Sequence, residues 1–234
     1  MHRLKREFLT FIAHELRTPL NTLTAIELLD PTDDPRLQAD MLAILRRGYD
    51  RLEKFIETAL TYFRWQAGEE EGLVDRAAIS DLVRVVRSAA ANVPGLSTSE
   101  RELLLALPDA PCLVYGREQH LTTVVHILLE NAVKFSPDEQ PIAARIHAAA
   151  AHAVLTVTDQ GQGFAPELAA VLFQPFTIGE VMHHAHGTGL HLALADAIVT
   201  AYGGHIWACS PGVGHGATFT VEWPAVAGER RPAF

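Results

Sequence analysis

An imidazole and a carboxylate stand side by side at His14 and Glu15, in a stretch whose spacing predicts a helix. The apolar residues of this stretch recur in steps of three and four, with one longer gap, as on a helix face that packs against other helices; they are Leu9, Ile12, Leu16, Leu23 and Ile26. At about 100° per residue, His14 points away from that face, and Thr18 lies one turn further along on the side of His14. An exposed imidazole beside a carboxylate could accept a transferred group, although a solvated surface histidine would look the same in isolation.

A second set of chemically useful side chains lies on a helix predicted over residues 119–135. Asn131, Lys134 and Phe135 stand at i, i+3 and i+4, so they share one helix face. An amide oxygen, an ammonium and an aromatic ring on one face could bind a metal ion, a phosphate and a base. An ordinary polar helix end would contain the same residues, so this segment does not decide the function by itself.

Two glycine-containing segments lie at predicted boundaries of secondary structure. Asp159, Gly161 and Gly163 come directly after a predicted strand, where glycine lets the backbone approach a flat ring and the carboxylate could accept from an exocyclic amine. Backbone N–H groups at a helix start can bind phosphate, and a second segment leads into a helix predicted over residues 191–202. This second segment consists of Gly187, Thr188, Gly189 and Leu190. Each G-x-G alone is weak evidence, because glycines mark turns in every fold.

Composition limits the class of protein. A chain of 234 residues, 48% of them hydrophobic, suits one large domain or two small ones and excludes a wholly disordered chain. A net charge of −9 and a pI near 5.7 argue against a nucleic-acid partner. No apolar stretch is long enough to span a membrane, and we expect no signal peptide before the first helix. Cys112 and Cys209 lack metal-ligand spacing and fit a reducing cytoplasm.

Two long helices predict a helical hairpin that needs a partner. The first covers residues 1 to about 29 with a bend at Pro19, residues 30–35 form a turn, and the second covers residues 36–65. Apolar residues of the second helix also alternate in steps of four and three: Leu45, Tyr49, Leu52, Ile56, Ala59 and Phe63. A single hairpin cannot cover the resulting apolar face. We therefore expect two hairpins to pair as a four-helix bundle, which makes the chain a homodimer.

Beyond a polar linker at residues 67–72, the pattern changes to mixed helix and strand, which predicts a domain boundary. Helices are predicted over residues 77–92, 119–135 and 191–202, and strands over residues 102–107, 112–115, 142–148, 153–158, 205–210 and 217–223. These elements do not follow a strict βαβ alternation. They predict an α+β sandwich, in which a mixed sheet has helices on one face.

Taken together, these motifs resemble those of sensor histidine kinases of two-component systems. The similar segments are HELRTPL from His14 (the phospho-acceptor box), ENAVKF around Asn131 (the N-box), DQGQGF from Asp159 and GTGL from Gly187 (the two glycine boxes), and FQPF ending at Phe176 (the phenylalanine box). The resemblance runs from about Leu4 to Pro224. It implies a dimerisation and histidine phosphotransfer domain over residues 1–66, a linker over 67–74, a catalytic ATP-binding domain over 75–227 and a tail over 228–234.

The resemblance also implies a role for each matching residue. His14 would be phosphorylated, Glu15 would fix its tautomer, and Thr18 would place a water for dephosphorylation of a partner. Asn131 would be the Mg²⁺ ligand, and Glu130 an acid–base or metal-shell residue. The other contacts with ATP would come from Lys134, Phe135, Asp159, Gly161, Gly163, Phe176, Gly187, Thr188, Gly189 and Leu190.

The implied activity is autophosphorylation of His14 from Mg-ATP, followed by transfer to an aspartate of a response-regulator receiver domain, with dephosphorylation of that receiver as a second activity. Lys134 would contact a phosphate, Asp159 would select adenine, and residues 177–186 would form a lid over ATP. We expect a cytoplasmic chain, with any membrane anchor located upstream in the parent protein.

Three positions depart from the family pattern. Ile127 replaces the N-box asparagine one turn before Asn131, His191 replaces the third glycine of the second glycine box, and Arg117 follows Gly116 where aspartate is usual. The first two motivate an alternative, a dimeric phosphotransfer or phosphatase scaffold that binds nucleotide without catalysis. A related ATPase without phosphohistidine chemistry is a third interpretation, and the HELRTPL segment argues against it.

Overall fold

The computed structural model describes residues 35–66, 74–96, 101–149, 151–176 and 189–226. By their contacts, these residues form two compact units. One unit contains residues 35–63 with the short pieces 175–176 and 189–190, and the other contains the remaining described residues. The predicted first helix and most of the predicted linker lie outside the described residues.

Helix α2 (Pro35–Gln66) confirms the predicted second helix to within one residue at each end. Its buried side chains are Phe55, Thr58, Ala59 and Tyr62. The predicted apolar face is only partly covered, because Tyr49 and Ile56 are 62% and 44% exposed. Two neighbouring apolar stripes run along this helix, and only one of them is buried within a single chain. The exposed one, which we call the α2 outer stripe, consists of Leu42, Tyr49, Ile56 and Leu60.

The second unit is built on a five-stranded mixed sheet with the strand order β2-β4-β5-β7-β6. Its strands are β2 (Leu103–Ala106), β4 (Ile142–Ala148), β5 (His152–Asp159), β6 (His205–Cys209) and β7 (Ala217–Pro224). β2 pairs with β4 in parallel, and the other three pairs are antiparallel. Along β5, Leu155 and Val157 are buried while Thr156 and Thr158 are half-buried, as expected for a sheet that is covered on one face. The mixed sheet confirms the predicted α+β class.

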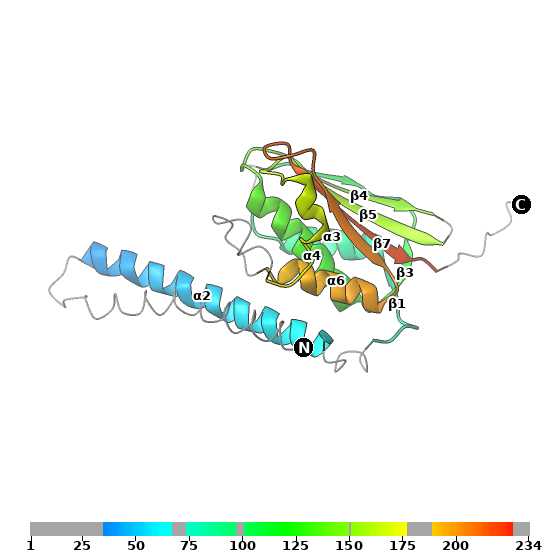
Figure 1. Cartoon of the computed structure of the whole chain (residues 1–234), viewed down its shortest axis with the longest axis horizontal. Helices are drawn as coiled ribbons and strands as arrows, with labels where there is room; N and C mark the ends of the chain where they lie inside the picture. Colours follow the sequence, from blue (N-terminus) through cyan, green and yellow to red (C-terminus); the bar gives the residue numbers. More distant parts are fainter. Residues whose placement is uncertain (1–34, 67–73, 97–100, 150, 177–188, 227–234) are drawn as a thin grey trace, which may run out of the picture. The chain divides into compact units, whose positions relative to one another are not determined.

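Three helices cover one face of this sheet (Figure 1), namely α3 (Leu82–Asn92), α4 (Glu118–Phe135) and α6 (His191–Ala201). α4 contacts both other helices and also β5. The fully buried core includes Leu128 of α4, Leu155 of β5, Ile198 of α6 and Trp223 of β7. Because burial of each large apolar side chain contributes about 1.5–3 kcal/mol, this shared core holds α4 and β5 in a fixed relation.

The start of α3 differs from the predicted helix over residues 77–92. Ile79–Asp81 instead form strand β1, which pairs antiparallel with β3 (Leu113–Tyr115). Oδ1 of Asp81 accepts from the backbone N–H of Val83 at 3.0 Å and from that of Cys112 at 3.0 Å. This N-cap therefore also ties the helix start to a segment distant in sequence, which a local pattern cannot reveal.

The other predicted elements within the described residues are confirmed to within one residue at each end, and β4 coincides with the predicted strand. A short 3₁₀ helix, η3 (Pro166–Ala170), was not predicted. Among the helices that the structure describes, none has the length and apolar character needed to cross a membrane.

Candidate functional site

The C-terminal half of α4 carries the predicted N-box residues. Leu128 and Ala132 are fully buried, whereas Asn131 and Phe135 are half-buried and Lys134 is exposed. The ammonium of Lys134 lies 4.8 Å from the centroid of the Phe135 ring, within the range of a cation–π contact. The helix is therefore anchored by its apolar side and offers an amide, an ammonium and a ring at the edge of the core.

Glu130, the predicted acid–base or metal-shell residue, pairs with a histidine one turn earlier. Nε2 of His126 lies 3.3 Å from Oε1 of Glu130, and the two side chains are 33% and 26% exposed. Sequence reasoning did not single out His126, for which the i, i+4 spacing is the only signal. The Glu130 carboxylate is thus oriented by a neighbour on its own helix.

The turn that follows β5 contacts the end of α4. Oδ1 of Asp159 accepts a hydrogen bond from the backbone N–H of Gly161 at 2.8 Å. The backbone N–H of Gln162 donates to the carbonyl oxygen of Phe135 at 3.0 Å, and a Cβ at position 161 would lie 2.1 Å from that oxygen. Only glycine permits this approach. The structure therefore brings Asp159 and Gly161 next to Phe135.

The Asp159 carboxyl is only 5% exposed. Burial raises its pKa, because surroundings of low polarity disfavour the charged form, while hydrogen bonds from the backbone of Gly161 and Ala217 act in the opposite direction. A buried carboxyl with a raised pKa is typical of a site that has a function other than stability.

Replacement of Asp159 by Asn should raise thermal stability near neutral pH. The pKa of Asp159 in the folded state lies above the ordinary value of about 4. The carboxyl therefore contributes its full stabilisation to the fold below about pH 4, and this contribution is lost as the pH rises through the raised pKa. The Tm of Asp159→Asn should therefore exceed that of the parent at pH 7.5, and the difference should shrink toward pH 4.

Calorimetric melting between pH 4 and 8 measures this difference. Asp109→Asn, which removes an exposed carboxylate of the same unit, is the matched control and should follow the parent. Parallel pH curves for the parent and Asp159→Asn would show that the buried carboxyl carries no such penalty.

The first unit contains the predicted residues Phe176 and Gly189. The backbone N–H of Phe176 donates to the carbonyl oxygen of Gly189 at 3.2 Å, and a Cβ on Gly189 would lie 3.1 Å from Cα of Phe176. Both have positive φ values, 65° and 64°, which is uncommon for phenylalanine. The predicted Leu190 follows and is fully buried, and α6 begins at His191.

Five predicted site residues lie outside the described residues: His14, Glu15, Thr18, Gly187 and Thr188. The predicted lid over residues 177–186 lies there as well. The roles given to these residues, and to the candidates that the structure describes, remain predictions.

One of the three departures from the family pattern has a structural role that its side chain explains. Ile127 is 4% exposed and belongs to the apolar core. The backbone N–H of Arg117, at the N-cap of α4, donates to the Tyr202 hydroxyl at 3.3 Å. His191 is the first residue of α6 and is half-buried. The Ile127 side chain therefore serves the fold, whereas the Arg117 bond comes from the backbone and does not depend on its side chain.

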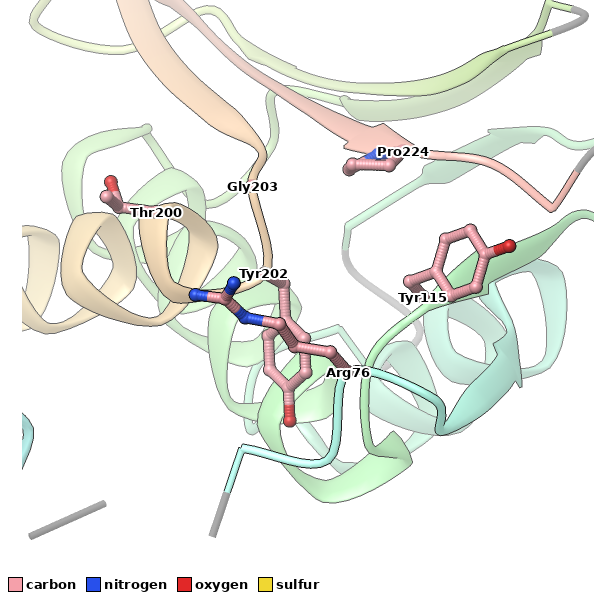
Figure 2. Close-up of a pocket in the computed structure, with 6 residues that line it drawn as sticks. All are labelled: Arg76, Tyr115, Thr200, Tyr202, Gly203 and Pro224. Atoms are coloured by element: carbon pink, nitrogen blue, oxygen red, sulfur yellow. The ribbon is translucent and has the colours of Figure 1, made fainter. Parts of the chain in front are cut away.

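A cavity of about 270 Å³ lies at the end of the second unit where α6 ends (Figure 2). It is lined by Arg76, Tyr115, Thr200, Tyr202, Gly203 and Pro224. The Tyr202 hydroxyl is 2.7 Å from Nδ1 of His120, which fixes one wall. Of the predicted site residues that the structure describes, none lines this cavity, so it is separate from the candidate nucleotide site.

Two known protein families match consecutive parts of the chain and define its class. Residues 116–227 match the family described as histidine kinase-, DNA gyrase B- and HSP90-like ATPase, and residues 4–68 match the His Kinase A (phospho-acceptor) domain. With both domains in this order, the chain belongs to the sensor histidine kinases of two-component systems.

Two curated relatives have similar sequences. The probable sensor histidine kinase TcrY of Mycobacterium tuberculosis is 30% identical over 214 residues, which cover 88% of this chain and 44% of TcrY. The sensor protein KdpD of Escherichia coli is 30% identical over 229 residues, which cover 95% of this chain and 24% of KdpD. The chain thus spans less than half the length of these relatives.

Two solved structures share the fold. Full-length ShkA in complex with AMPPNP matches with a TM-score of 0.67 and 26% identity over 95% of this chain and 46% of ShkA. Histidine kinase ThkA in complex with the response regulator protein TrrA matches with a TM-score of 0.72 over 97% of this chain and 66% of the ThkA chain. At 18% identity, the likeness to ThkA concerns the fold alone.

Proposed function

We propose that this chain is the core of an ATP-dependent protein-histidine kinase, which autophosphorylates His14 and passes the phosphoryl group to an aspartate of a response-regulator receiver domain. The observation that carries the proposal is the packing of the Asp159 turn against the end of α4, where Asn131 and Lys134 also lie. Membership of the sensor histidine kinases of two-component systems supports a receiver as partner. Dephosphorylation of that receiver, with Thr18 placing the water, belongs to the same proposal.

ATP would bind to both glycine boxes and the N-box. The Asp159 carboxylate, held on one side by the N–H of Gly161, would accept a hydrogen bond from the adenine amine. Phe135 would contribute to the wall of the site beside Gly161, and Lys134 would offset phosphate charge. The remaining contacts would come from Gly163, Phe176, Gly187, Thr188, Gly189 and Leu190. The ShkA complex with AMPPNP supports a nucleotide as the ligand of this fold.

Mg²⁺ fits the donor groups of this site when ATP supplies most of its ligands. In the part of the chain that the structure describes, no group of three or more His, Cys, Asp or Glu side chains could hold a metal ion alone. Asn131 offers one amide oxygen at the edge of the core, with the Glu130 carboxylate adjacent in sequence. Hard Mg²⁺ prefers such oxygen ligands beside phosphates, whose negative charge it would neutralise.

The phosphoryl transfer needs an imidazole with a free lone pair. The Nε2 atom of His14 attacks the γ-phosphorus, the N–P bond forms, and the bond to the β–γ bridging oxygen breaks, so that ADP leaves. Glu15 would accept a hydrogen bond from Nδ1–H of His14, which would hold this tautomer and offset positive charge on the ring. The receiver aspartate then attacks the phosphorus and the N–P bond breaks.

Incubation with γ-labelled ATP and Mg²⁺ tests the proposal. The chain should acquire a label that is lost in acid and survives base, as expected for phosphohistidine. A chain that binds ADP and acquires no label would instead support the second candidate, the non-catalytic phosphotransfer or phosphatase scaffold, for which the buried Ile127 is the favouring observation.

A homodimer is part of the proposal, because the α2 outer stripe needs a cover. Tyr49, Ile56 and Leu60 are 62%, 44% and 53% exposed in a single chain, and they recur on one side of a 32-residue helix. Two copies could bury these stripes against each other in a four-helix bundle.

Ile56→Glu should therefore convert the dimer into monomer at micromolar concentration. Each copy would lose an apolar contact that contributes about 1.5–3 kcal/mol, so the dimer dissociation constant should rise about a hundredfold or more. Light scattering coupled to size exclusion measures the change. Ile79→Glu is the matched control, because Ile79 is 50% exposed in the other unit and should leave the dimer intact. A dimer that persists in Ile56→Glu would place the interface elsewhere.

We further propose the domain boundaries that the resemblance implies: residues 1–66 for dimerisation and phosphotransfer, 67–74 for the linker, 75–227 for ATP binding and 228–234 for the tail. The chain would act in the cytoplasm, where ATP and a receiver are available. Sensory input would come from parts of the parent protein outside this chain.

A further inference from the structure

We propose that Ser210 is a positioning residue for nucleotide binding, which holds the Asp159 turn (residues 159–164) through its side-chain hydroxyl. Ser210 begins the β6–β7 turn (residues 210–216), about fifty positions along the chain from Asp159. The inference deepens the proposed function and rests on it, because the Asp159 turn is the segment proposed to recognise adenine.

The Ser210 hydroxyl connects the two turns and uses its full hydrogen-bonding capacity. Oγ accepts from the backbone N–H of Phe164 at 3.1 Å and from that of Gly212 at 3.2 Å. Its O–H donates to the carbonyl oxygen of Gly216 at 2.7 Å. The carbonyl oxygen of Gly212, at 3.1 Å, is a second acceptor within hydrogen-bond distance of the same O–H. A hydroxyl has one donor and two acceptor sites, and Ser210 is only 8% exposed, so loss of the hydroxyl would leave buried backbone groups without their partner.

Backbone hydrogen bonds continue the contact between the turns. The N–H of Gly214 donates to the carbonyl oxygen of Gln162 at 2.6 Å, and the N–H of Gly216 donates to that of Gly161 at 3.0 Å. Three residues of the Asp159 turn, Gly161, Gln162 and Phe164, are thus hydrogen-bonded to the β6–β7 turn, and the bond to Phe164 is the one that the Ser210 side chain makes.

The two turns approach so closely that only glycine fits at the contact. A Cβ at Gly163, where φ is 57°, would lie 2.4 Å from the carbonyl oxygen of Gly212 and 2.8 Å from Oγ of Ser210. A Cβ at Gly216, where φ is 70°, would lie 2.1 Å from the carbonyl oxygen of Asp159 itself. The β6–β7 turn therefore rests directly on the backbone that carries the Asp159 carboxylate.

The opposite contact comes from α4, whose last carbonyl oxygen, on Phe135, accepts from Gln162. The Asp159 turn is consequently held between the end of α4 and the β6–β7 turn. Ser210 is the one side chain among the described contacts that joins these two turns, and it is absent from the residues proposed to touch ATP. Its role is to fix where the Asp159 carboxylate lies.

Binding of ADP with Mg²⁺ by calorimetric titration tests this role. Ser210→Ala should weaken binding about tenfold or more, and should also reduce the preference for ADP over GDP, under conditions where circular dichroism shows the variant folded. Ser80→Ala is the matched control, since Ser80 is a buried serine of the same unit whose Oγ donates to the Gly116 carbonyl oxygen at 2.7 Å. It should lose stability but bind ADP within twofold of the parent.

A second variant covers the case in which Ser210→Ala does not fold. Gly214 is exposed, has φ of 84° and has no atom within 4 Å of a Cβ position, so Gly214→Ala strains only the tip of the turn. It should weaken ADP binding about threefold through the contact with Gln162.

The outcomes separate the two proposals. The positioning role alone would be overturned if the parent chain binds ADP and Ser210→Ala binds it equally well. If Ser210→Ala is unfolded, the same conclusion follows from equal binding by Gly214→Ala. A parent chain that does not bind ADP would overturn the proposed nucleotide site and this role with it.

Discussion

Replacement of His14 by Gln should abolish the acid-labile label acquired from γ-labelled ATP, a fall of about a thousandfold or more. Glutamine has no lone pair on nitrogen that can attack phosphorus, so the N–P bond cannot form. The nucleotide site should be unaffected, because position 14 belongs to the phosphotransfer domain and not to the segments proposed to contact ATP. His14→Gln should therefore bind ADP as the parent does, which is measured by titration.

His147→Gln is the matched control for this experiment. His147 is an exposed histidine of β4 with no proposed role, so the same substitution is made at a residue outside the candidate site. The control should keep its full label. A label that survives in His14→Gln would show that another residue accepts the phosphoryl group, and a label lost equally in both variants would mean that the loss is not specific to position 14.

Asp159→Asn should weaken ADP binding about a hundredfold while making the chain more stable at neutral pH. The amide removes the charged acceptor for the adenine amine, and a hydrogen bond to a charged group contributes about 1.5–3 kcal/mol. The substitution also removes a buried carboxyl group, and burial has raised the pKa of that group. Opposite effects on binding and stability rule out unfolding as the cause of the lost affinity.

The affinity loss is measured by titration with ADP and Mg²⁺ at pH 7.5. Asp109→Asn should bind like the parent, because it removes one negative charge from the same unit without touching the Asp159 turn. Binding by Asp159→Asn within threefold of the parent would show that this carboxylate does not recognise the base, even if the chain is a kinase.

Most of the sheet could be predicted from the sequence, because alternating burial leaves a local pattern. Along β5 and β7, threonines on one side alternate with apolar residues on the other, and β4 was predicted at its observed bounds. Strand β1 has only three residues and forms through pairing with β3, more than thirty positions away, so it leaves no periodic signal. The covered face of α2 was predicted only in part, because Tyr49 and Phe55 belong to adjacent stripes that are both apolar.

The candidate site likewise has features that local sequence spacing indicates and features that it does not. The helical spacing of Asn131, Lys134 and Phe135 predicted side chains on one face, and their shared role in nucleotide binding stays a prediction. The approach of Gly161 to the Phe135 carbonyl brings together segments that only the family resemblance connected. Ser210 had no sequence signal, since a serine in a turn is common and its partner in the Asp159 turn, Phe164, lies 46 positions earlier.

The position of β7 has a consequence for when the sheet can be completed during synthesis. β7 comes last in the sequence among the strands that the structure describes, but it lies between β5 and β6 in the sheet. Until it emerges from the ribosome, β5 and β6 both have an unpaired edge, and such late, non-local pairing delays completion of a fold. The contacts of Gly216 with the Asp159 turn form at the start of this same strand. A truncated chain without β7 should therefore lack the contacts that hold the Asp159 turn, and we expect it to bind ADP far more weakly than the parent.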